Sequence, residues 1–340
     1  MTQILVVDDN VVSLKHINSL LGADYDISLA KSGAQALQIC AQEKPDLILL
    51  DINMPEMDGF ETLARLKSNP YMTNIPVIFL TGNDAIETKI HALEAGARDF
   101  LTKPVEQRLL KHRVNLHLRF NAYQEHLERS VFELSNSVAT SFAELIECRD
   151  QNTGEHVSRT SRYVGLLGRY LLKQGYCPEE LTDESLEMMV RGAPLHDIGK
   201  IGISDRILLK PDRLTDDEFV TMKQHAIIGA EILERMYART PSLRYLQYAK
   251  MIAAYHHERY DGNGYPYGLA GENIPLCGRL MAVADVYDAL KEERVYRKKL
   301  HHAEVFLIVM NGKGSCFDPN IIDAFEAIHS ELNSDTSPAT

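Results

Sequence analysis

The sequence lacks the long apolar run that a membrane-spanning helix requires, and it lacks any cluster of basic residues. No stretch approaches the roughly 18 consecutive apolar residues of a membrane span, so we expect no such span. The chain enters an apolar run at residues 4–7 with no basic or long hydrophobic segment before it, so we expect no secretory leader. The formal net charge is −12, which disfavours DNA binding because the phosphate backbone is also negative.

Cysteine is scarce as well, and its five positions form no C-x-x-C pair. An odd and scattered set is typical of reduced thiols in the cytosol, so we predict a cytoplasmic protein. The 340 residues leave room for two domains, each with a hydrophobic core. The hydrophobic fraction of 45% and the charged fraction of 25% favour ordinary globular domains over disordered segments.

The first third of the chain alternates short apolar runs with segments of helical period. The apolar runs predict strands at 4–7, 26–30, 47–50, 77–80 and 98–101. The periodic segments predict helices near 12–21, 33–43, 59–68, 85–95 and 105–119. Strands that are apolar throughout and alternate with helices form a parallel sheet covered on both faces. We therefore predict a doubly wound α/β domain with a five-stranded parallel sheet at residues 1–120.

A long helix is predicted after this domain, because residues 105–146 contain no glycine or proline and mix charged and apolar residues at helical spacing. Residues 121–140 are its linker portion. The helix could be a solvated spacer or a signalling helix that pairs with a second copy, and the imperfect heptad pattern leaves both interpretations open. Of the two we expect the second, a homodimer through the linker helix.

Beyond residue 140 every strong pattern is helical, which predicts an all-α domain at residues 141–332. Thr215 and Glu218 have the spacing of a capping box, in which the threonine caps a helix start and the glutamate reaches back. Residues 333–340 are polar and are expected to form a disordered tail.

Polar side chains follow four of the predicted strands in the first domain. Asp8 and Asp9 follow the first strand, Asp51 the third, Thr81 the fourth and Lys103 the fifth. Ligands of open parallel sheets bind at the carboxyl ends of the strands, so these side chains should meet. Three clustered carboxylates imply a hard divalent cation such as Mg²⁺. Asp51 is then placed to attack phosphorus, with Lys103 and Thr81 holding the new phosphoryl group.

Across residues 1–120 these motifs resemble the receiver domain of two-component response regulators. The resemblance implies that Asp51 is the phosphoacceptor and that a cognate sensor histidine kinase is the partner. It also implies that Phe100 is the switch aromatic that turns inward when Thr81 moves. The magnesium ligands would be Asp8, Asp9, Asp51 and the backbone carbonyl of Asn53.

Five histidines and two aspartates of the second domain have the residue types and spacing of a metal site. Asp285 lies within an apolar helical segment, where a buried carboxylate is costly unless a metal or another cation meets it. Mixed imidazole and carboxylate ligands suit iron, manganese, zinc or nickel better than calcium. The candidate ligands are His156, His196, Asp197, His225, His256, His257 and Asp285.

Such a site predicts phosphodiester hydrolysis. Two metals bridged by one carboxylate lower the pKa of a water molecule toward about 7 and so supply a nucleophile for in-line attack. Lys200 lies one helical turn from His196, where it could neutralise phosphate charge. Asp197 and Lys200 are therefore the candidate catalytic residues.

The segments HDIGK at 196–200, HHERYDG at 256–262 and NGYP at 263–266 resemble the HD superfamily of phosphohydrolases. The last segment narrows the resemblance to the HD-GYP subfamily, the cyclic di-GMP phosphodiesterases, over about residues 140–325. The resemblance implies two transition metals, iron or manganese, with Asp197 as the bridging ligand, and a linear pGpG product that could be cleaved onward to GMP. The implied substrate-facing set is Lys200, Gly264, Tyr265, Asp288, Arg294 and Arg297.

The sequence departs from this subfamily at two positions. Asn152 stands where some members have a glutamate ligand for a third metal, so we expect two metals. Val295 replaces a frequent proline. The adjacent pair His301 and His302 matches no motif and is interpreted as surface. Two alternatives stay open, a catalytically weak effector that binds a cyclic dinucleotide or a protein, and a hydrolase of another cyclic dinucleotide.

Overall fold

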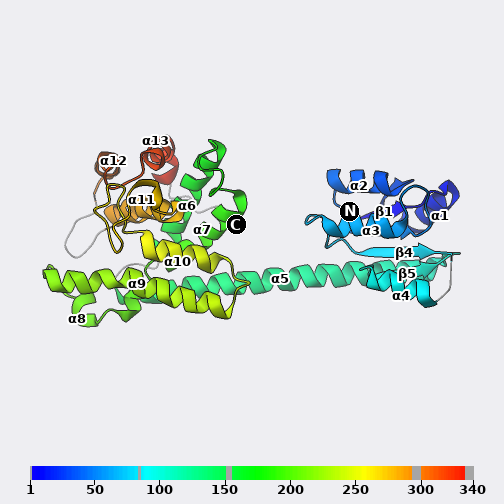
Figure 1. The fold of residues 1–340 in the computed structure, drawn as a ribbon, viewed down its shortest axis with the longest axis horizontal. Helices are drawn as coiled ribbons and strands as arrows, with labels where there is room; N and C mark the ends of the chain where they lie inside the picture. Colours follow the sequence, from blue (N-terminus) through cyan, green and yellow to red (C-terminus); the bar gives the residue numbers. More distant parts are fainter. Residues whose placement is uncertain (1, 83–85, 151–154, 293–299, 334–340) are drawn as a thin grey trace. The chain divides into compact units, whose positions relative to one another are not determined.

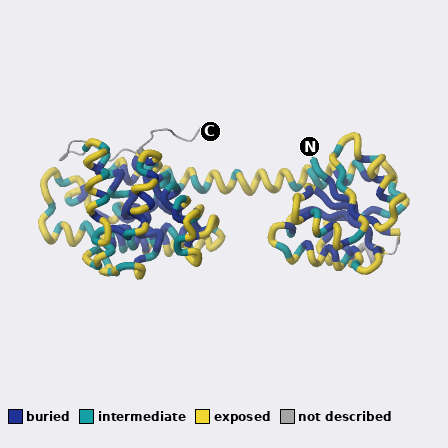
Figure 2. Tube along the Cα trace, turned by 90° about the horizontal axis from the view of Figure 1, so that it is seen from above, coloured by how far each residue is buried: buried dark blue, intermediate teal, exposed yellow. Residues whose placement is uncertain are grey.

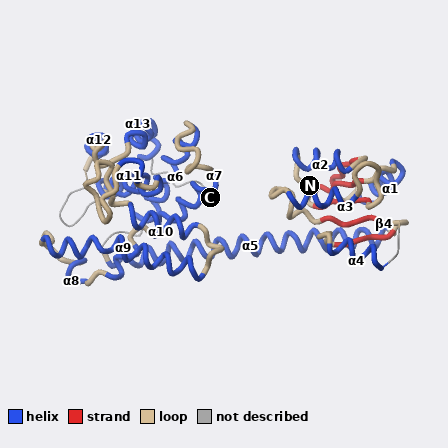
Figure 3. The backbone as a smooth tube through the Cα atoms, in the orientation of Figure 1, coloured by secondary structure: helices blue, strands red, loops and turns tan. Residues whose placement is uncertain are grey.

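The computed structural model describes residues 2–82, 86–150, 155–292 and 300–333. The chain divides into two compact units, Met1–Phe132 and Glu133–Thr340. Figure 1 labels their helices and strands, and Figure 3 shows that the strands of the described ranges belong to the first unit. No helix among the described residues is both long enough and apolar enough to cross a membrane.

The first unit is built on a parallel sheet with the strand order β2-β1-β3-β4-β5. Its strands are β1 (Gln3–Val7), β2 (Asp26–Ala30), β3 (Leu47–Asp51), β4 (Val77–Thr81) and β5 (Asp99–Thr102). The central strands β3 and β4 are buried at every residue, as expected of strands covered on both faces. The predicted doubly wound α/β fold is confirmed.

Helices cover both faces of this sheet. The helices of the unit are α1 (Val11–Leu21), α2 (Gly33–Gln42), α3 (Gly59–Ser68), α4 (Ile86–Glu94) and the start of α5 (Gln107–Arg149). One apolar core joins α1 and α5 to alternate strand residues such as Val6 and Leu49. The other core joins α2, α3 and α4 to the intervening residues, such as Leu5 and Leu50. Figure 2 shows the buried strands between their exposed helices.

Helix α5 continues without a break from the first unit into the second, as the absence of glycine and proline predicts. The second unit is helical. Its elements are α6 (Glu155–Lys173), α7 (Asp183–Gly192), η1 (Ala193–Leu195), η2 (Ile198–Gly202), α8 (Asp205–Leu208), α9 (Asp216–Arg239), α10 (Tyr245–Tyr255), η3 (Gly271–Asn273), α11 (Leu276–Lys291), α12 (His302–Asn311) and α13 (Pro319–Asn333). The predicted capping box at Thr215 is present at the start of α9.

Two apolar clusters hold the helices of the second unit together. One joins α6, α7, α11, α12 and α13, and the other joins the end of α5 to α6, α9 and α10. The short element η2 lies so close to α9 that a Cβ at Gly199 would come within 1.9 Å of the His225 carbonyl oxygen. Glycine is therefore required at this position for Asp197, two residues earlier, to lie beside the histidine of α9.

Candidate phosphoacceptor site and candidate metal centre

The carboxyl ends of the first unit's strands bring together the side chains predicted to receive a phosphoryl group. Lys103 follows β5, and its ammonium lies 2.7 Å from an Asp8 oxygen and 3.0 Å from an Asp51 oxygen. Thr81 is the buried last residue of β4. The carboxylates of Asp8, Asp9 and Asp51 lie within 4.8 Å of one another, close enough to share one cation.

Two buried carboxylates of this site differ in how they are held. Asp8 is fully buried and accepts hydrogen bonds from the backbone N–H of Asn10 and the hydroxyl of Ser13. Burial raises the pKa of Asp51, and Asp8 acts in the same direction, although Lys103 opposes the shift. Burial and the neighbouring carboxylate thus set Asp51 apart from an exposed aspartate.

The two remaining predicted residues of this site lie at its edge. Asn53 is exposed in the loop between β3 and α3, two residues after Asp51. Phe100 on β5 is half-buried and packs against the core that includes α4. Both positions are compatible with the roles implied by the receiver resemblance.

In the second unit, all seven candidate metal ligands lie in two neighbouring groups. One group contains Asp197, His225, His256 and His257, and the other contains His156, His196 and Asp285. Within each group one ligand atom per residue lies within 4.8 Å of the others. The rings of His196 and His256 join the two groups, with centroids 5.3 Å apart. These ligands come from α6, α9, α11, the end of α10 and the segment between η1 and η2.

Asp197 lies between the two groups. One of its carboxylate oxygens is 3.2 Å from Nε2 of His225 and 3.6 Å from Nε2 of His256. Its other oxygen is 3.3 Å from Nε2 of His196. The two oxygens of one carboxylate thus face different sets of histidines, which is the geometry of a bridging ligand.

Four buried polar atoms at this centre have no hydrogen-bond partner among the described residues: Nε2 of His196, His225 and His256, and one Asp197 oxygen. Buried polar atoms are normally paired, because leaving one unpaired costs about 1–3 kcal/mol. All four atoms are donors suited to a divalent transition metal. The residues present therefore fit a metal centre.

Backbone carbonyls orient three of the histidine rings. Nδ1 of His196 lies 3.0 Å from the Ala193 oxygen, and Nδ1 of His225 lies 2.8 Å from the Met222 oxygen. Nδ1 of His256 lies 3.0 Å from the Ile252 oxygen. An Nδ1–H donated to a carbonyl leaves Nε2 deprotonated and directed into the site, as metal ligation requires.

The ionisation states also suit ligation. Burial lowers the pKa of His256 and, more strongly, that of His257, so both rings are neutral at pH 7. Burial alone would raise the pKa of Asp197, but Lys200 and His196 hold it well below its usual value. His196 is the exception: burial lowers its pKa, yet Asp197 outweighs this and raises it to about 9, so a metal would have to displace a proton from this ring.

Lys200 has a different environment from the predicted one. Its ammonium lies 2.8 Å from Asp197, 2.5 Å from Asp150 and 3.4 Å from Glu147. Three carboxylates already compensate its charge, and the side chain is 12% exposed. The structure places Lys200 where it positions Asp197, and its role in neutralising phosphate charge stays a prediction.

Asp288 also differs from its predicted role of facing the substrate. It is fully buried, and one oxygen lies 2.8 Å from Nδ1 of His156. The other oxygen accepts a hydrogen bond of 2.7 Å from Arg159, which also pairs with Glu292. In this conformation Asp288 orients the His156 ring and is closed to substrate.

The loop after α10 carries the remaining described residues of the predicted substrate set. The Tyr265 ring stacks on His257 with centroids 4.7 Å apart and so forms one wall of the centre. A Cβ at Gly264 would come within 2.3 Å of the Arg259 nitrogen, so this glycine is required for packing. The carboxylate of Glu258 accepts hydrogen bonds from the backbone N–H groups of residues 267–269, which fixes the loop.

Three predicted positions, Asn152, Arg294 and Arg297, lie outside the described residues. Conversely, sequence reasoning missed Glu147, Asp150, Arg159 and Glu258. Glu147, Asp150 and Arg159 lie outside the recognised motifs, and Glu258 lies within HHERYDG. Its place directly after the two histidines was the one available signal.

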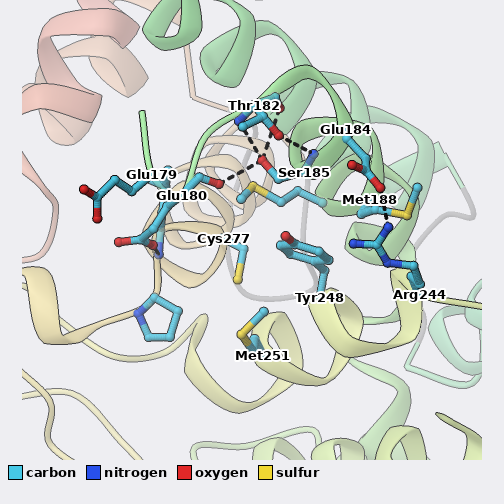
Figure 4. A pocket seen from close by; sticks show the side chains of 13 residues that line it. Glu179, Glu180, Thr182, Glu184, Ser185, Met188, Arg244, Tyr248, Met251 and Cys277 are labelled. Atoms are coloured by element: carbon cyan, nitrogen blue, oxygen red, sulfur yellow. Dashed lines mark hydrogen bonds and ion pairs between the residues drawn. The ribbon is translucent and has the colours of Figure 1, made fainter. Parts of the chain in front are cut away.

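A separate cavity of about 370 Å³ lies between α7, α10 and the start of α11, lined by Met188, Tyr248, Met251 and Cys277 among others. Figure 4 shows these side chains with the Glu184–Arg244 pair at its edge. None of the predicted site residues lines this cavity, so it is distinct from the metal centre.

Comparison with protein families gives two matches. The model of the response regulator receiver domain matches residues 4–115, and that of the HD domain matches residues 141–321. The second match implies that the helical unit binds divalent metal, in agreement with the two groups of ligands.

Three relatives match over nearly the whole chain. The chain is 44% identical to a probable cyclic di-GMP phosphodiesterase of Vibrio cholerae, over 95% of its own length and 76% of that protein. It is 36% identical to the cyclic di-GMP phosphodiesterase response regulator RpfG of Xanthomonas campestris, over 94% and 86%. It is 34% identical to a cyclic di-GMP phosphodiesterase of Thermotoga maritima, over 98% and 91%.

Proposed function

Because the chain belongs to the family of response regulators that join a receiver domain to an HD phosphohydrolase domain, we propose that it linearises cyclic di-GMP under the control of phosphorylation at Asp51. The observation that carries the proposal is the pair of ligand groups joined by Asp197, with four buried donor atoms that lack a protein partner. The names of the three relatives supply the substrate.

The metal content we propose is two ions of iron or manganese. The ligands would be His225, His256 and His257 for one ion and His156, His196 and Asp285 for the other, with Asp197 bridging. Two such ions supply a nucleophile from water near neutral pH and stabilise charge on the phosphoryl oxygens.

The residues of the chain position this chemistry. Carbonyl acceptors and Asp288 fix the histidine rings, so that the ligand nitrogens need no reorganisation. Lys200 holds Asp197 ionised and oriented. Tyr265 stacks on His257, and we propose that it contacts the substrate beside the metal centre. The product we propose is linear pGpG, with GMP as the product of a second cleavage.

The receiver unit would supply regulation. We propose Mg²⁺ bound by Asp8, Asp9, Asp51 and the carbonyl of Asn53, and a cognate histidine kinase as phosphoryl donor. Lys103, already paired with Asp51, would move to the phosphoryl oxygens, and Thr81 would follow. We also propose that the chain forms a homodimer through the linker helix.

The decisive experiment is turnover of a panel of cyclic dinucleotides by protein purified without oxygen and analysed for bound metal. We expect cyclic di-GMP to be hydrolysed with the highest kcat/KM and pGpG to appear first. Preference for a mixed cyclic dinucleotide would replace the proposed substrate. Binding without turnover in a fully metal-loaded sample would make the protein an effector.

A further inference from the structure

A cation lies beside the metal centre on α9, at the half-buried Lys223. Its ammonium is 4.9 Å from the centroid of the Phe219 ring and 5.6 Å from the centroid of the Tyr265 ring. Both distances are within the roughly 6 Å at which an aromatic ring attracts a cation. Phe219 precedes Lys223 by four residues, so the two side chains share one face of the helix. The two rings therefore favour one position of the ammonium.

Tyr265 connects this cation to the metal centre. Its ring stacks on the ring of His257 with centroids 4.7 Å apart, and the ring of His225 meets it edge to face at 6.5 Å. Phe219 also meets Tyr265 edge to face, with centroids 6.3 Å apart. One tyrosine ring thus separates the Lys223 ammonium from two of the proposed metal ligands, at the edge of the centre.

Lys223 differs from Lys200 in its carboxylate partners. The ammonium of Lys200 lies against three carboxylates, those of Glu147, Asp150 and Asp197. In the part of the chain that the structure describes, Lys223 pairs with no carboxylate, and its contacts are the two aromatic rings. The positive charge of Lys223 is therefore available to an anion that enters the site.

The proposed substrate requires a cation outside the metal ligands. A cyclic dinucleotide carries two phosphodiester groups, each with one negative charge at neutral pH. Two metal ions stabilise the charge of the group that is cleaved and leave the other group without a counter-charge. The formal net charge of the chain is −12, which disfavours an anion at long range. Binding of the second phosphodiester group therefore calls for a local positive charge.

We infer that Lys223 binds the phosphodiester group that is not cleaved. The inference rests on the proposed function and adds a substrate-binding residue that the sequence motifs do not contain. The ammonium donates to the non-bridging oxygens of that group, while Phe219 and Tyr265 hold it beside the metal centre. A charged hydrogen bond at a half-buried position contributes about 5–20-fold to affinity.

The experiment compares two substrates on the full, metal-loaded chain. Cyclic di-GMP carries a second phosphodiester group, whereas the p-nitrophenyl ester of GMP carries the guanine and a single phosphodiester group. Lys223→Gln should lower kcat/KM for cyclic di-GMP by about 5–20-fold, mainly through KM, and that for the ester by less than about 2-fold. Lys223→Arg should recover most of the loss because it keeps the charge. If the ester is not cleaved, its inhibition constant against cyclic di-GMP is compared instead.

Lys173→Gln is the control, because it removes the same charge from the same unit. Lys173 is exposed in the last turn of α6, and about 25 Å of helix separate it from His156. It should leave both substrates unaffected. Equal losses on both substrates from Lys223→Gln, no loss on cyclic di-GMP, or an equal loss from Lys173→Gln overturns the inference. Bound metal is measured for each variant, and loss of metal from Lys223→Gln would also overturn it.

Calorimetric titration separates this inference from the proposed function. If metal-loaded wild type binds cyclic di-GMP without cleaving it, the proposed hydrolysis fails, and Lys223→Gln should still bind cyclic di-GMP about 5–20-fold more weakly than wild type. Equal binding by the variant and wild type would then overturn the role of Lys223. A wild type that neither binds nor cleaves cyclic di-GMP overturns both.

Discussion

Each of the two sites of this protein gathers acidic side chains around a lysine, but the two differ in what else surrounds the carboxylates. In the receiver unit Lys103 lies within 3.0 Å of both Asp8 and Asp51, so the protein supplies its own counter-charge. In the helical unit the histidine nitrogens around Asp197 are left without partners among the described residues. The first site therefore pairs its carboxylates with a protein cation, whereas the second keeps buried donor atoms that a metal can bind.

The strongest test of this comparison replaces one aspartate in each site by asparagine. Asp197→Asn should remove most bound transition metal and lower kcat/KM on the order of 10³-fold, because the bridging carboxylate is lost. Asp51→Asn should leave the bound transition metal unchanged and abolish phosphorylation. Elemental analysis and initial rates provide the measurement. Full metal content in Asp197→Asn would exclude the bridging role.

A second substitution tests whether the metal centre depends on residues that do not themselves bind the ion. Asp288→Asn keeps the shape of the side chain but removes the negative charge that meets Nδ1 of His156. We expect metal affinity to fall about 10–100-fold with the fold unchanged. Competition with a chelator measures this, and Glu155→Gln, an exposed neighbour on α6, is the control. Equal behaviour of the two variants would leave Asp288 without a positioning role.

A third test asks whether a phosphate mimic on Asp51 changes the rate of hydrolysis at the metal centre. Beryllium fluoride bound to Asp51 should alter turnover, and we expect activation by about 5–150-fold, the usual range of coupling between two sites. Wild type and Asp51→Ala are compared with and without the mimic at saturating metal. Identical rates in all four samples, with the mimic bound to wild type, would assign the receiver to localisation or partner choice.

The smallest effect is expected from histidines outside both sites. His301 is exposed at the start of α12, so His301→Ala should change stability by less than about 0.5 kcal/mol and leave metal content intact. His257→Ala should abolish hydrolysis. His302 is half-buried and stacks on His329, so the structure corrects its interpretation as a surface residue, and it is unsuitable as a control. Thermal melts and metal analysis of His301→Ala and His257→Ala measure these effects.

Much of this architecture could be predicted from the sequence, for identifiable reasons. The strands of the first unit begin and end within about one residue of the predicted positions, and three of them, β1, β3 and β4, contain short, continuous apolar runs. The residues of the metal centre could be proposed because His and Asp types suited to ligation recur in recognisable segments. The positions of these side chains relative to one another came only from the structure.

Sequence patterns do not show which partners several buried side chains face. Lys200 is neutralised by Glu147 and Asp150, which precede it by about fifty residues and share no motif with it. Asp288 lies on the same helix as Asp285, and only packing against α6 shows that it faces His156.

The carbonyl acceptors of the histidine rings have a consequence for how this centre tolerates genetic change. His196, His225 and His256 are oriented by main-chain oxygens, which every amino acid provides, so substitution of the residue carrying the acceptor leaves that acceptor in place. His156 is oriented by a side chain, Asp288, which a single base change can remove. A natural mutation at Asp288 would therefore weaken metal binding by His156 and leave the other three histidines oriented. We expect inactive descendants of this enzyme to arise first by loss of Asp288.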